Sequence, residues 1–176
     1  DNAEDRIAMV KQTCEELQLP IISVVGVSVG LIDFNPSVQK FHLERCKRYL
    51  DMGVTLGAKN YLLVIGEYIW QKEVIPPEEQ WKWAVEHCQT LGEYAAECGL
   101  EIVIELEPFD LSLVNTIGEM DRFLTDCDNS AVKANIDISH MVLSDSPPES
   151  LDSLKGRAGH VHISDCDGKV HGDLPP

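Results

Sequence analysis

Carboxylates and histidines stand at the ends of three β-rich runs of this chain. Glu107 ends the run EIVIELEP, Asp137 ends AVKANID, and His162 lies in GHVHISDCDG. Because the carboxyl ends of parallel strands meet at one edge of a sheet, we expect these three side chains to share a site. Two carboxylates and one imidazole suit a single divalent ion such as Mn²⁺, Mg²⁺, Co²⁺ or Zn²⁺, and leave positions open for substrate or water.

A divalent ion bound by these residues would favour proton transfer next to a carbonyl group of a substrate. The ion could polarise the carbonyl and hold an enediolate while a neighbouring carboxylate moves a proton between carbons, which is the chemistry of ketose and aldose rearrangement. His140, three residues after Asp137, is expected either to hydrogen-bond a substrate oxygen or to support a metal ligand.

Other residues near these runs have more than one interpretation. Trp70 follows a strand and could form a wall of the substrate site or cover the edge of the core, and His171 could be a second-site ligand, a substrate contact or an exposed loop residue. Glu105 is interpreted as a partner inside the barrel rather than a ligand. His160 is expected on the face of its strand opposite to His162, packed under a helix.

Helical and β-type patterns alternate strictly along the chain. Helices are expected over 3–18, 37–56, 77–98, 115–127 and 148–154, and strands over 20–28, 60–66, 101–107, 131–138 and 159–164. Alternation with short connections predicts parallel strands. An open doubly wound sheet is disfavoured, since neither GxGxxG nor GxxxxGK[ST] occurs. We therefore predict one domain over residues 1–176, an α/β fold with about five βα units of a TIM-type (β/α) barrel.

Composition narrows the classes of partner. The net charge of −16 disfavours binding to nucleic acid, and no apolar run reaches the ~20 residues that span a membrane. The six cysteines follow no metal-finger spacing and are interpreted as reduced thiols of a cytoplasmic protein.

The motifs IELEP, NIDISH, HVHISDCDG and KVHGDLPP, in this order, resemble the sugar phosphate isomerase/epimerase family of xylose isomerase-like barrels. That family includes ketose 3-epimerases and inosose dehydratase, and it shares its fold with endonuclease IV. The resemblance implies that Glu107, Asp137 and His162 bind metal, that Glu107 also exchanges a proton, and that His140 contacts substrate. It further implies that the first barrel strand and the last βα units, with one more metal-binding glutamate, lie outside this chain.

The chain departs from the family pattern at three positions. Leu113 stands where ketose 3-epimerases have a substrate-binding glutamate, and Gly168 stands where they have an arginine. Lys169 replaces a zinc-binding aspartate of the endonuclease IV group. The usual contacts of ketohexose epimerisation and the trinuclear DNA-repair site are therefore not expected.

These observations favour a metal-dependent sugar or sugar-phosphate isomerase or epimerase. Two alternatives stay open: a dehydratase of keto-cyclitols such as inosose, and a non-catalytic truncated barrel or sugar-binding subunit. The expected partners are a small sugar or sugar phosphate, together with a second copy of the chain or another chain that completes the barrel, because open sheet edges favour pairing.

Overall fold

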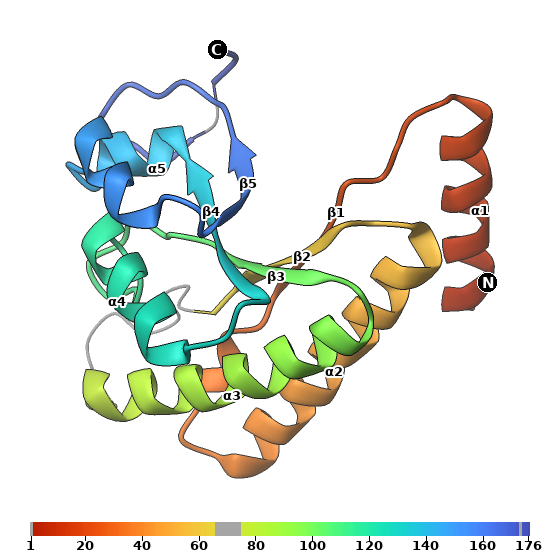
Figure 1. Ribbon diagram of the computed structural model, residues 1–176, viewed down its shortest axis with the longest axis horizontal. Helices are drawn as coiled ribbons and strands as arrows, with labels where there is room; N and C mark the ends of the chain where they lie inside the picture. The colour runs from red at the N-terminus through yellow and green to blue at the C-terminus, as the bar shows by residue number, and fades with distance from the viewer. Residues whose placement is uncertain (1, 66–74, 173) are drawn as a thin grey trace.

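A five-stranded parallel sheet forms the centre of the chain (Figure 1). The computed structural model describes residues 2–65, 75–172 and 174–176. The strands lie in the order in which they occur in the chain, and every neighbouring pair is parallel. Their bounds are Ser23–Val27 for β1, Asn60–Val64 for β2, Glu101–Ile104 for β3, Val132–Asp137 for β4 and Ala158–His162 for β5.

Helices connect the strands, as the alternating pattern predicts. The α-helices are α1 (Ala3–Glu16), α2 (Pro36–Leu56), α3 (Pro77–Glu97), α4 (Ile117–Cys127) and α5 (Ile138–Leu143), and the 3₁₀ helices are η1 (Val29–Ile32) and η2 (Pro148–Leu154). Four of the α-helices begin with a side-chain cap, from Asn2, Asn35, Thr116 and Asp137. The last of these helices, α5, did not appear in the sequence pattern, because six residues are too few to show a helical period.

One face of the sheet packs against α2, α3 and α4. Tyr61, Leu63, Ile102 and Ile104 are fully buried on that face. The helices contribute buried side chains that include Leu50, Leu91 and Phe123. The opposite face of the sheet holds a smaller buried cluster of Leu62, Val64 and Val103. Burial of each such side chain stabilises the fold by about 1.5–3 kcal/mol, so the helix-covered face holds the sheet in place.

The two outer strands leave apolar side chains exposed. Val25 on β1 is 57% exposed, and Ile163, just after β5, is 69% exposed. Helix α1 stands to one side of the body beyond β1 (Figure 1), and it buries no residue. The architecture is a partial (β/α) barrel, as predicted, and the described residues add no further strand beside β1 or β5.

Strand β3 ends earlier than the sequence predicts. Its last residue is Ile104, whereas the expected strand ran on to Glu107. The backbone N–H of Glu105 still donates to Leu63 of β2, at 3.1 Å, but that of Glu107 donates to Val114 within its own loop, at 3.0 Å. Pro108 has no N–H to offer a neighbouring strand. Glu107 therefore belongs to the loop that follows β3.

No helix in the described part of the chain combines the length and the apolar character needed to cross a membrane. All six cysteines lie in that part and are free thiols.

Candidate metal centre

The carboxyl ends of β4 and β5 place Asp137 beside His162. The two residues face each other in the strand register, and Nδ1 of His162 lies 3.2 Å from Oδ2 of Asp137. Asp137 is also the N-cap of α5, where its Oδ1 accepts from the backbone N–H of His140 at 3.1 Å and from the Ser139 hydroxyl at 2.8 Å. The two predicted ligands from adjacent strands thus lie in direct contact.

Asp137 is held in its ionised form. Burial alone would raise the pKa of its carboxyl group, but the hydrogen bonds from His140 and Ser139 and the charges of His140 and His162 outweigh burial, and the pKa is lowered. One oxygen is occupied by the helix cap and the other faces His162. The free lone pairs of this second oxygen suit a cation.

His140 lies at the centre of the site. Its Nδ1 lies 2.5 Å from the carbonyl oxygen of Leu106 and 3.4 Å from Oε1 of Glu105. Since a carbonyl only accepts, Nδ1 carries a proton. Its Nε2 lies 2.9 Å from Nε2 of His171, so one of these two nitrogens donates to the other. Burial lowers the pKa of His140, but Glu105, Asp137 and the Leu106 carbonyl outweigh this and raise the pKa to about 9.

Glu107 also lies close to His140. Glu107, His140 and His171 offer ligand atoms within 4.8 Å of one another, and so do Glu105, Asp137 and His140. In the described residues, Glu107 and Asp137, which the sequence assigns to one ion, therefore fall in two groups that share His140. Glu107 is 8% exposed.

A loop after β5 brings His171 to the site. Asp165 and Leu174 exchange backbone hydrogen bonds of 2.9 Å and close this loop, and the Asp167 carboxylate accepts from the N–H groups of Lys169 and Val170. The His171 ring lies 4.9 Å from that of His140 and 5.2 Å from that of Phe109, measured between ring centroids. Among the three interpretations of His171, this placement favours a role in the site.

One sequence interpretation was wrong. His160 and His162 lie on the same face of β5, with ring centroids 5.1 Å apart. Side chains of a strand alternate with a period of two, so residues two apart share a face. Burial, followed by the charge of His162, lowers the pKa of His160. Trp70, for which the sequence suggested a role in the substrate wall or at the edge of the core, lies outside the described residues.

The same period of two identifies two site residues that the sequence interpretation missed or set aside. Asn135, two residues before Asp137, donates through Nδ2 to Oε2 of Glu105 at 2.7 Å and lies 3.1 Å from Nδ1 of His162. Glu105, two residues before Glu107, contacts both His140 and His162. Asn135 and Glu105, each two residues before a predicted ligand, therefore contact the histidines of the site.

The opposite pKa shifts of two histidines predict a titration order in the metal-free chain. As the pH rises from 5, His160 should lose its proton first and His140 only near pH 9. Because folding raises the pKa of His140, its contribution to stability is complete below its unfolded pKa of about 6.5 and is lost as the pH rises through 9. NMR titration of the histidine ring protons measures this order. A midpoint for His140 below that of His160 would contradict the assigned contacts.

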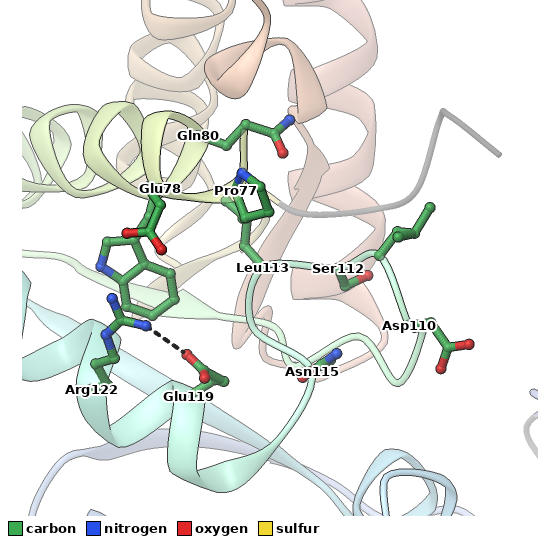
Figure 2. Close-up of a pocket in the computed structure, with 11 residues that line it drawn as sticks. Pro77, Glu78, Gln80, Asp110, Ser112, Leu113, Asn115, Glu119 and Arg122 are labelled. Atoms are coloured by element: carbon green, nitrogen blue, oxygen red, sulfur yellow. Dashed lines mark ion pairs between the residues drawn. The ribbon is translucent and has the colours of Figure 1, made fainter. Parts of the chain in front are cut away.

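A separate cavity of about 210 Å³ lies between the start of α3, the loop before α4, and α4 itself (Figure 2). Arg122 stacks over the Trp81 ring at 4.1 Å and pairs with Glu119 at 3.5 Å. The buried hydroxyl of Ser112 also lines the cavity and has no hydrogen-bond partner. This cavity is distinct from the carboxylate and histidine cluster.

Comparison with known proteins gives matches along the whole chain. The family model of the xylose isomerase-like TIM barrel matches residues 1–176. The D-psicose 3-epimerase of Ruminiclostridium cellulolyticum is 27% identical over 143 residues, which are 80% of this chain and 48% of that protein. The inosose dehydratase of Geobacillus thermodenitrificans is 27% identical over 134 residues, which are 69% of this chain and 44% of that protein.

A solved structure shows the same fold. The D-psicose 3-epimerase of Clostridium cellulolyticum H10, crystallised with D-tagatose, superposes with a TM-score of 0.83 at 24% identity, over 98% of this chain and 62% of that chain. This chain therefore spans about half the length of the two curated relatives. The family match over its full length, together with the parallel partial barrel, shows that the chain belongs to the xylose isomerase-like TIM barrel family.

Proposed function

We propose that this chain carries the site of a metal-dependent isomerase or epimerase that acts on a sugar or sugar phosphate by proton transfer next to a carbonyl. The observation that carries the proposal is the 3.2 Å contact between Asp137 and His162, with Glu107 and His140 at the same edge of the sheet. Relatives in the same family include an epimerase and a dehydratase, which supports the proposal that this chain belongs to an enzyme.

The donor set fits a divalent ion. Asp137 turns one oxygen toward His162, and Oε1 of the buried Glu105 has no hydrogen-bond partner. We assign Glu107, Asp137 and His162 as ligands of one ion, which can be Mn²⁺, Mg²⁺, Co²⁺ or Zn²⁺. When bound, the ion supplies a positive charge that polarises the carbonyl group of the substrate.

Residues of this chain are assigned to proton transfer and to orientation of the substrate. Glu107 is buried enough to act on a carbon-bound proton away from bulk water, so we assign it as the base. His140 is held by the Leu106 carbonyl, and its Nε2 faces His171. The two histidines can donate hydrogen bonds to substrate oxygens and orient the sugar. Trp70 remains a proposed part of the substrate wall.

The proposed function is tested by exchange of the carbon-bound proton with solvent, which does not depend on knowing the product. With Mn²⁺ in D₂O, the chain should incorporate deuterium next to the carbonyl of a ketose or ketose phosphate, measured by proton NMR. Glu107→Gln should lower the exchange rate by at least about 100-fold, the usual contribution of general base catalysis. Glu101→Gln, a change of the same kind at the start of β3, should leave it unchanged. Exchange that persists in Glu107→Gln would contradict the role of Glu107.

A keto-cyclitol dehydratase is the second candidate, because an inosose dehydratase is among the relatives and Leu113 and Gly168 replace the epimerase contacts. Its reaction begins with the same proton abstraction. Loss of water from an inosose, without epimerisation of any ketose, would favour it. Binding of sugar without exchange on any substrate would favour the non-catalytic, sugar-binding alternative.

Two further assignments belong to this proposal. The exposed apolar residues of β1 and the segment after β5 favour association with a second copy or with another chain that completes the barrel. A monodisperse monomer in sedimentation experiments would contradict this.

The free thiols agree with a reducing compartment, and we propose a cytoplasmic location.

A further inference from the structure

We propose that Glu105 is a further ligand of the divalent ion, binding it together with Asp137 and His162. The inference rests on the proposed metal site and adds to it a residue that the family motif does not assign. Glu105 is 5% exposed and lies beneath the edge where Asp137 and His162 meet.

The distances between the donor atoms are those of neighbouring ligands. Nδ1 of His162 lies 3.2 Å from Oδ2 of Asp137 and 3.6 Å from Oε2 of Glu105. Two ligands that bind one ion at about 2.1 Å lie about 3.0 Å apart at a right angle and about 3.4 Å apart at a tetrahedral angle. Ligand atoms of Glu105 and Asp137 lie within 4.8 Å of each other, so a movement of the Glu105 side chain would bring its carboxylate, Asp137 and His162 to one ion.

The hydrogen bonding of Glu105 is incomplete. Its Oε2 accepts from Asn135, but its Oε1 is buried with no hydrogen-bond partner. The nearest cationic group that faces Oε1 is the His140 ring, at 3.4 Å. A buried carboxylate is costly unless it is paired and hydrogen-bonded, so an oxygen that has the His140 ring beside it but accepts no hydrogen bond leaves room for a second cation.

Asn135 holds Glu105 in place. The Asn135 side chain is 1% exposed, and its Nδ2 lies 2.7 Å from Glu105 and 3.1 Å from His162. Carboxylates that bind a metal ion commonly accept a hydrogen bond from a second residue, and this hydrogen bond orients the ligand. Asn135 on β4 therefore orients Glu105, which directly follows β3.

The competing explanation is that Glu105 only neutralises the charge of His140. That explanation predicts an effect of Glu105 on stability and none on metal affinity. Calorimetric titration with Mn²⁺ of the full chain, freed of metal by chelation, separates the two. Glu105→Gln keeps the size of the side chain and can still accept from Asn135, but it removes the charge.

The matched control is Glu101→Gln. Glu101 is the first residue of β3, four residues before Glu105, and its Oε2 is near Gly159. We expect Glu105→Gln to weaken Mn²⁺ binding by at least about 10-fold, the lower end of the range for residues that merely support a ligand. Glu101→Gln should bind like the wild type.

The outcomes separate this inference from the proposed function. If Glu105→Gln binds Mn²⁺ like the wild type while Asp137→Asn loses binding, Glu105 is not a ligand and the proposed metal site stands. If the wild-type chain binds no Mn²⁺, both are wrong. If circular dichroism shows that Glu105→Gln does not fold, Glu105→Asp replaces it, because it keeps the charge and shortens the side chain by one methylene group. Weakening of Mn²⁺ binding by about 10-fold in that variant supports the inference, and unchanged affinity overturns it.

Discussion

Replacing Asp137 with alanine is expected to abolish specific Mn²⁺ binding and to destabilise the metal-free chain. Asp137 has two separable roles, since Oδ2 faces His162 and Oδ1 caps α5 through the backbone N–H of His140. Loss of a charged ligand should lower the affinity by at least about 100-fold, the upper end of the range for residues that only support a ligand. Loss of the cap should cost about 1 kcal/mol of unfolding free energy.

Asp137→Asn separates these two roles. Asparagine is as good an N-cap as aspartate, so this variant should keep the stability of the metal-free chain and still lose Mn²⁺ binding. Calorimetry gives the affinity, and urea unfolding in the presence of a chelator gives the stability. For the wild type, Mn²⁺ at 100 times its dissociation constant should add about 2.7 kcal/mol of stability. Mn²⁺ binding by Asp137→Asn with wild-type affinity would mean that the contact with His162 is only structural.

The second large effect is expected in the core. Phe123 of α4 is fully buried and meets the Trp81 ring edge to face, with ring centroids 5.3 Å apart. Phe123→Ala should lower the free energy of unfolding by about 3–5 kcal/mol, because it removes this contact and leaves a cavity. Domains of this kind are stable by only about 5–15 kcal/mol, so the variant should unfold at a much lower urea concentration.

Phe34→Ala is the matched control for this change. Phe34 is 65% exposed, so the same substitution should change the free energy of unfolding by less than about 0.5 kcal/mol. Tryptophan fluorescence follows both transitions, since Trp81 packs against Phe123. Equal urea midpoints for the two variants would contradict the packing of α4 against α3.

Most of the fold follows from the sequence, because hydrophobic periodicity is a local property. Strict alternation of helical and β-type segments requires parallel strands, and the structure confirms five of them in chain order. The same local pattern placed Asp137 near the end of β4, and it placed His162 within β5, which ends at His162 rather than at the predicted residue 164. The common face of His160 and His162 was equally determined by the period of two, and the wrong interpretation ignored it.

Other parts of the site depend on contacts made by loops, which have no regular period. The end of β3 at Ile104 depends on whether Glu107 bonds to a neighbouring strand or to its own loop, and Val114 supplies that bond. His171 reaches His140 only because the Asp165 to Leu174 loop folds back over the edge of the sheet. Neither partner can be read from periodicity, since each lies in a loop.

Which carboxylate faces which histidine was decided by the tertiary structure alone. Sequence spacing puts Glu105 and Glu107 on the same side of one strand, and both could reach the site. In the structure, Glu105 contacts Asn135 and His162, whereas Glu107 groups with His140 and His171. The sequence by itself determined the parallel sheet and the residue types at its edge. Their partners depend on distances between strands, which no pattern along one chain contains.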